Sequence, residues 1–161
     1  MTAAVTTLVL GLGNLVMQDD GAGVHVVRHL CERYRFPEDI SIVDGGTLGL
    51  DLLPMFEGVD RLIVVDAVDC GVEPGGLVRL AGDDVPVALA TKVSPHQMGL
   101  KDLLAVADLQ GILPGEVVLI GIQPASTEMG MELSPGVSSG MAGVEALVLE
   151  ELAGWGITPL R

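Results

Sequence analysis

Two aspartates and one histidine stand at points of the chain where polar side chains often gather around a ligand. Asp20 follows an apolar run and its glycine-rich loop, Asp66 ends another apolar run, and His96 lies in a Ser-Pro-His-Gln segment. Two carboxylates and an imidazole form a ligand set that suits Ni, Zn, Co or Fe and leaves positions open for water or substrate. These residue types therefore indicate a metal site if the fold brings them together.

The same three residues also have an ordinary structural interpretation. Asp20 can serve as a helix N-cap, Asp66 as a turn former at a strand end, and His96 as a hydrogen-bonded loop residue. Spacing and residue type alone do not choose between this interpretation and a metal site.

The elements that would position these residues follow from the apolar periodicity, which predicts strands alternating with helices. Strands are expected at 6–10, 40–43, 61–65, 76–80 and 116–122, and helices at 22–34, 48–55, 98–109 and 137–152. The helix at 48–55 is expected to end with the help of Pro54. On the helix at 22–34, Val24, Val27, Leu30 and Cys31 form the expected buried face.

The spacing around the fourth strand decides the type of sheet. Only nine residues, 67–75, separate Asp66 from the run at 76–80, whereas a parallel crossover needs a dozen or more. The fourth strand is therefore expected to run antiparallel. The predicted fold is an α/β three-layer sandwich, with a mixed, mostly parallel five-stranded sheet, helices on both faces and one domain over 1–161. Ligands of such sheets bind beyond the carboxyl ends of the strands, where Asp20, Asp66 and His96 are expected to meet.

Composition narrows the class of protein and its surroundings. The net charge of −14 disfavours nucleic acid and anionic membranes as partners. The segment 1–7 lacks the positive charge of a secretory signal, and no apolar run is long enough for a membrane span. Cys31 and Cys70 are isolated and expected as free thiols, which fits a reducing compartment. We therefore expect a cytoplasmic protein.

The sequence motifs of the loops resemble those of one known family, the hydrogenase maturation proteases. The matching motifs, in the same order and at similar spacing, are Gly11-Leu12-Gly13-Asn14-Leu15, Asp19-Asp20-Gly21-Ala22-Gly23-Val24, Asp44-Gly45-Gly46-Thr47, Asp66-Ala67 and Ser94-Pro95-His96-Gln97-Met98-Gly99-Leu100. Gly121-Ile122-Gln123-Pro124 is similar to the family's last strand. The resemblance runs from about Thr7 to Ile122 and weakens over the C-terminal helix.

The resemblance implies an endopeptidase that removes the C-terminal tail of a nickel-iron hydrogenase large-subunit precursor after nickel has been inserted. In the family, an acidic group in the first loop, an aspartate after a later strand and the histidine of a His-Gln motif reach the metal. Asp20, Asp66 and His96 occupy these positions. The first is glutamate in many members, so Asp20 is one methylene shorter with the same charge. Nickel would come largely from the substrate, and Zn, Cd or Co would substitute in isolation.

The resemblance leaves the chemistry of the cut open. The three side chains can hold nickel that polarises the scissile carbonyl or activates a water molecule. Alternatively, Asp20 and Asp66 act as an acid and base pair in an aspartic-type mechanism, with nickel serving recognition alone. Asp44, Gly45, Gly46, Thr47 and Gln97 are candidate substrate contacts. The expected partner is the precursor, and the protein is expected to be a monomer.

The same residues are also compatible with other functions. A non-catalytic metal-sensing chaperone would use the same three ligands to hold the precursor without cutting it. Gly11-Leu12-Gly13 also permits a nucleotide-binding loop, although Asp19 and Asp20 would repel the phosphates. His25 and His29 are four residues apart on one predicted helix, a spacing that permits metal binding, but the segment offers no third ligand. We interpret the two histidines as surface or packing residues.

Overall fold

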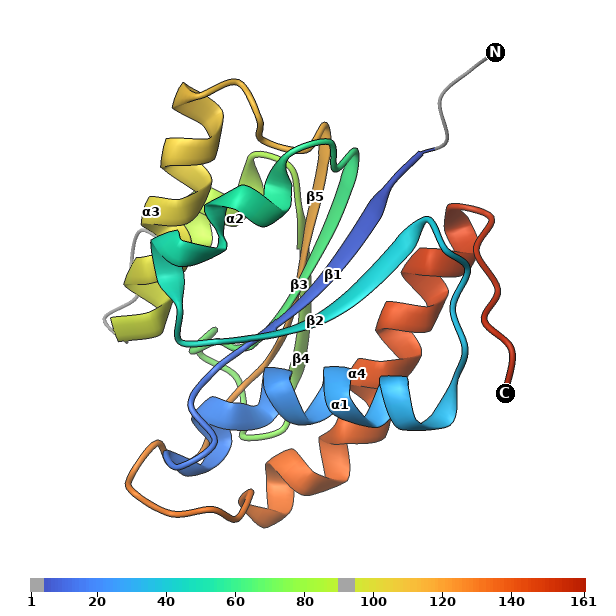
Figure 1. Cartoon of the computed structure of the whole chain (residues 1–161). Coiled ribbons are helices and arrows are strands. Elements are labelled where there is room, and N and C mark those ends of the chain that lie inside the picture. The colour runs from blue at the N-terminus through green and yellow to red at the C-terminus, as the bar shows by residue number, and fades with distance from the viewer. Residues whose placement is uncertain (1–4, 90–94) are drawn as a thin grey trace.

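The computed structural model describes residues 5–89 and 95–161, which form one five-stranded sheet between two helical layers (Figure 1). The strands are β1 (Thr7–Leu12), β2 (Ile40–Gly46), β3 (Arg61–Ala67), β4 (Leu77–Ala81) and β5 (Glu116–Ile122). The helices are α1 (Ala22–Arg33), α2 (Asp84–Leu89), α3 (Pro95–Leu109) and α4 (Pro135–Gly154), with two 3-10 helices, η1 (Gln18–Gly21) and η2 (Gly49–Phe56).

The sheet has the order β2-β1-β3-β5-β4, and only β4 is antiparallel to its neighbour. Leu77 of β4 lies opposite Ile122 of β5, so the strand turns back directly along β5. The short connection after Asp66 leaves no room for a crossover helix, as the sequence predicted. The mixed α/β fold with helices on both faces is therefore confirmed.

Two apolar cores lie on the two faces of the sheet. Helices α1 and α4 cover one face, and η2, α2 and α3 cover the other (Figure 1). Because successive side chains of a strand point to opposite faces, Leu8 and Leu10 of β1 enter the core under η2 and α3, whereas Val9 enters the core under α1 and α4. All six residues of β1 are buried, as expected of a central parallel strand.

Several element boundaries differ from the prediction. β2 continues through Gly46 instead of ending at residue 43, and η2 contains Pro54 and ends at Phe56. Helix α2 was not predicted, because its six residues with Pro86 are too few to show a helical period.

Cys31 does not lie in the core of α1. The buried stripe of this helix is centred on Val26, Val27 and Leu30, and Cys31 lies at its edge in the last turn, where it is exposed. The prediction that Cys31 packs in the core was wrong. Both Cys31 and Cys70 are free thiols, as predicted.

None of the helices formed by the described residues combines the length and apolar character that a bilayer crossing requires.

Candidate active site

Asp66 lies at the carboxyl end of β3 and is fully buried. It stands beside Gly121 of β5 in the parallel ladder. Alternation along the strand places it on the same face as Leu62 and Val64, which is the face covered by η2 and α3. A carboxylate at this position is withdrawn from bulk water and directed towards the layer that contains α3.

Asp20 lies in η1, the short helix between β1 and α1, and only 7% of it is exposed. Its Oδ2 accepts the backbone N–H of Asn14 at 3.1 Å. The N-cap of α1 is Gly21, so Asp20 is not the helix cap that the ordinary structural interpretation proposed. Gly13 permits this turn: its φ is +137°, and a Cβ there would lie 1.9 Å from the carbonyl oxygen of Asp20.

Both aspartates lie at the switch point of the sheet, because η1, which carries Asp20, contacts β3, which ends with Asp66 and Ala67. From β1 the chain crosses to β2 on one side, whereas β3 lies on the other side of β1. Ligands of open α/β sheets bind in the crevice at such a point, beyond the carboxyl ends of the strands. Helix α1 starts against these ends, because a Cβ on Gly23 would lie 2.1 Å from the carbonyl oxygen of Val65 and 2.5 Å from that of Leu12.

His96 lies in the first turn of α3 and not in a loop before it, because the helix begins at Pro95. Proline suits the first position of a helix, which the prediction of a start at Met98 overlooked. A Cβ on Gly99 would lie 3.6 Å from the Cα of Gly49, so the start of α3 packs beside the start of η2, just beyond the carboxyl end of β2. The backbone therefore places this turn at the same edge of the sheet as Asp20 and Asp66.

The side chains of 87–98, including His96 and Gln97, lie outside the described part of the structure. Among the side chains that are described, no three His, Cys, Asp or Glu residues cluster closely enough to hold a metal ion. The metal-binding and catalytic roles of Asp20, Asp66 and His96 stay predictions.

Asp19 has a structural role that the sequence did not reveal. It is fully buried, and its carboxylate accepts hydrogen bonds from the N–H groups of Ala125 at 2.8 Å, Ser126 at 3.1 Å and Ser134 at 2.7 Å, and from the Ser134 hydroxyl at 2.7 Å. Burial alone would raise the pKa of Asp19, but these hydrogen bonds together hold it below its usual value. Asp19 thereby ties η1 to the loop after β5.

Gln123 fixes the loop that follows Asp66. Its buried side chain accepts the N–H of Cys70 at 2.7 Å through Oε1 and donates through Nε2 to the Oδ1 of Asp69 at 3.1 Å and to the carbonyl of Pro124 at 3.3 Å. The motif around Gln123 was noted in the sequence, but its partners in a distant loop leave no local signal.

The Asp44-Gly45-Gly46 motif has a structural explanation of its own. Asp44 forms an ion pair with Arg28 of α1 at 2.9 Å and accepts the N–H of Gly46 at 3.1 Å. A Cβ on Gly45 would lie 2.8 Å from a methyl of Leu10, and Gly46 has a φ of +50°. The role of this motif, of Thr47 and of Gln97 in contacting substrate stays a prediction.

His25 and His29 have different surroundings on α1. His29 contacts Glu145 of α4 through Nδ1. The pKa of His25 is lowered, because burial disfavours the charged ring and the nearby Arg28 repels it. This agrees with the interpretation of both residues as surface or packing residues.

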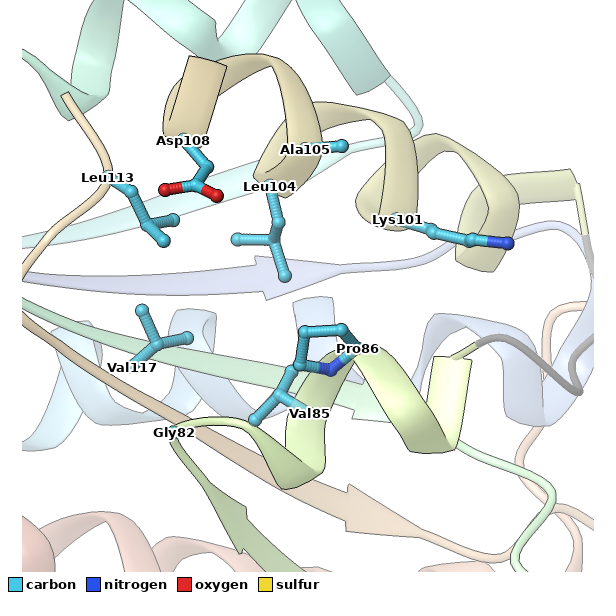
Figure 2. A pocket seen from close by; sticks show the side chains of 9 residues that line it. All are labelled: Gly82, Val85, Pro86, Lys101, Leu104, Ala105, Asp108, Leu113 and Val117. Atoms are coloured by element: carbon cyan, nitrogen blue, oxygen red, sulfur yellow. The ribbon is translucent and has the colours of Figure 1, made fainter. Parts of the chain in front are cut away.

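An apolar pocket of about 260 Å³ lies between α2 and α3 (Figure 2). Val85 and Pro86 of α2, Leu104 and Ala105 of α3, and Val117 of β5 line it. Val117 belongs to the start of β5, whereas Gly121, beside Asp66, lies near its end. The pocket is therefore not part of the candidate active site.

The chain is similar to proteins of hydrogenase maturation. A family model described as hydrogenase maturation protease matches residues 24–151. The hydrogenase expression/formation protein HupD of Rhodobacter capsulatus is 44% identical, over 93% of this chain and 72% of that protein. The hydrogenase 2 maturation protease of Escherichia coli is 38% identical, over 82% of this chain and 81% of that protein.

A solved structure agrees with both matches. The hydrogenase maturating endopeptidase HybD from E. coli superposes with a TM-score of 0.92 and 35% identity, over 97% of each chain. Fold and comparisons together define a hydrolase of the endopeptidase class with a mixed α/β sheet. The chain belongs to the hydrogenase maturation protease family. The match continues through most of α4, further than the resemblance of the loops indicated.

Proposed function

We propose that this protein removes the C-terminal tail of a nickel-iron hydrogenase large-subunit precursor, and that it contacts the precursor's nickel through Asp20, Asp66 and His96. Of the relatives named above, one is named as a hydrogenase maturation protease, one as a hydrogenase maturating endopeptidase and one as a hydrogenase expression/formation protein. The observation that carries the proposal is the burial of Asp20 and Asp66 at the carboxyl ends of β1 and β3, the two strands that flank the switch point of the sheet.

The charge of this site suits a cationic target. Two carboxylates withdrawn from water at neighbouring strand ends concentrate negative charge there, and a divalent cation between them would offset that charge. Oxygen and imidazole ligands suit nickel, and a site that holds only part of the coordination shell leaves the rest to groups of the precursor. In this view nickel belongs to the substrate, and Zn, Cd or Co would take its place only in the isolated protein.

The tight packing of this edge would hold the carboxylates in place for the cut. Gly23 presses α1 onto the ends of β1 and β3, and the N–H of Asn14 orients the carboxylate of Asp20. Both chemical routes depend on these residues. In the metal-assisted route Asp20 and Asp66 hold nickel beside the scissile carbonyl, and in the aspartic-type route they transfer the protons themselves. We further propose that the protein acts as a monomer in the cytoplasm.

The proposal is tested by incubating nickel-loaded precursor with the protein and following the mass of the precursor's C-terminus. Asp66→Asn is expected to lower the cleavage rate at least a hundredfold, because the amide is neutral and a poor ligand. Asp102→Asn is the matched control: it removes a carboxylate from the exposed face of α3 and should leave the rate unchanged. Cleavage by Asp66→Asn at the rate of the unmodified protein would contradict the proposal.

A further inference from the structure

The loop between β5 and α4 displays an unusual five-residue segment, Glu128 to Glu132, in which two methionines flank a glycine and two glutamates flank the methionines. Met129 is 84% exposed and Met131 is 64% exposed. Val16, on the loop after β1, is 47% exposed. We call Val16, Met129 and Met131 the methionine lip.

The backbone of the methionine lip is held in place by hydrogen bonds between its two loops. The N–H of Gly130 donates to the carbonyl of Val16 at 2.8 Å, and the N–H of Gln18 donates to the carbonyl of Gly130 at 2.8 Å. The four hydrogen bonds accepted by the Asp19 carboxylate fasten the same loop to η1. The apolar side chains are therefore presented on an ordered frame.

The position of the lip relates it to the candidate active site. Gln18, which bonds to Gly130, belongs to the same 3-10 turn as Asp20. Figure 1 shows the loop before α4 beside the loop that follows β1, at the edge of the sheet where β1 ends. The lip therefore lies beside the turn that carries Asp20, where a macromolecule bound at this aspartate can contact it.

The chemistry of the lip is that of a protein-binding surface. Exposed large apolar side chains that gather in one place mark interaction sites, and methionine adapts its shape to varied partners. Glu128 and Glu132 are exposed on either side of the methionines and give the apolar centre an acidic rim. An apolar centre with a polar rim is the usual arrangement of a protein interface.

We propose that the methionine lip is the surface on which the hydrogenase large-subunit precursor docks, with an apolar patch of the precursor covering Met129 and Met131 and basic groups facing Glu128 and Glu132. This inference rests on the proposed function, because it takes the precursor as the partner. It adds a contact that governs binding of the precursor and leaves the chemistry at Asp20 and Asp66 unchanged.

The test compares the unmodified protein with Met129→Gln/Met131→Gln in two measurements on nickel-loaded precursor: the dissociation constant of the complex, and the KM and kcat of tail removal. Leu109→Gln is the matched control. Leu109 is 87% exposed and lies at the end of α3 remote from Pro95, about 21 Å along the helix axis. Met129→Leu/Met131→Leu keeps the apolar character and serves as the rescue.

The glutamine variant is expected to raise Kd and KM at least tenfold with kcat within twofold, whereas the leucine variant and Leu109→Gln behave like the unmodified protein. Values of Kd and KM within twofold of the unmodified protein would overturn the docking surface. Binding without any cleavage by the unmodified protein would overturn the proposed function. The docking surface would then still be tested by comparing the Kd of the glutamine variant with that of the unmodified protein. If the unmodified protein does not bind the precursor, both proposals fail.

Discussion

At the scale of single residues, two adjacent aspartates in one short turn have different surroundings. Asp19 turns towards the loop after β5 and accepts its N–H groups, whereas Asp20 lies beside Asn14 at the end of β1. Nothing in the sequence distinguishes Asp19, which has a structural role, from Asp20, the candidate site residue. Only their partners in space separate them, and those of Asp19 lie more than a hundred positions further along the chain.

Replacing Asp19 by asparagine is expected to destabilise the protein by about 2 to 3 kcal/mol, because the amide leaves buried N–H groups without an acceptor. Ser134→Ala, which removes only the hydroxyl from this cluster, should cost about 1 kcal/mol. Urea unfolding followed by circular dichroism at pH 7 measures both. An unfolding free energy of Asp19→Asn equal to that of the unmodified protein would show that the cluster is not stabilising.

The lowered pKa of Asp19 also predicts how this contribution varies with pH. A carboxylate whose pKa is lower in the folded state than in the unfolded state stabilises the fold above its unfolded pKa, near 4, and loses that contribution as the pH falls through the folded pKa. The difference in unfolding free energy between the unmodified protein and Asp19→Asn should therefore be full at pH 6 and shrink below about pH 4. A difference that grows towards pH 3 would contradict this assignment.

At the scale of elements, the site depends on how closely α1 approaches the ends of β1 and β3. Gly23→Ala would place a methyl group 2.1 Å from the carbonyl oxygen of Val65, so the helix must move away. The expected cost is about 1 to 3 kcal/mol of stability, together with a loss of cleavage, because η1 and Asp20 move with the helix. Thermal unfolding and the precursor assay measure the two effects.

The control for this substitution is Gly154→Ala at the end of α4, where a Cβ meets no atom within 4 Å. It should leave cleavage unchanged and either preserve or slightly raise stability. Equal effects of the two alanine substitutions would show that the close approach at Gly23 has no special role.

At the scale of the whole molecule, the positions and directions of the strands follow largely from local features of the sequence, namely the apolar runs and the lengths of the connections between them. Apolar runs located every strand within a few residues, and the nine residues after Asp66 sufficed to predict that β4 is antiparallel. Helix α2 and the early start of α3 were missed, because short helices and proline-led first turns carry little periodicity. The tasks of Asp19 and Gln123 were missed because they depend on long-range partners.

The candidate site residues were identified from the motifs of the loops and not from hydrophobic periodicity. Residue type and position identified Asp20 and Asp66 as candidates, and the fold places both at the carboxyl edge of neighbouring strands. The exposed pair Met129 and Met131 attracted no interpretation in the sequence, because nothing local distinguishes an exposed methionine from a buried one.

The measurement that tests the central claim most directly compares nickel-loaded with nickel-free large-subunit precursor, each incubated with the unmodified protein and followed by mass at the C-terminus. We predict loss of a short C-terminal peptide from the nickel-loaded precursor alone, because Asp20, Asp66 and His96 would then have a cation to contact. Removal of the tail from both precursors at the same rate would contradict recognition through nickel.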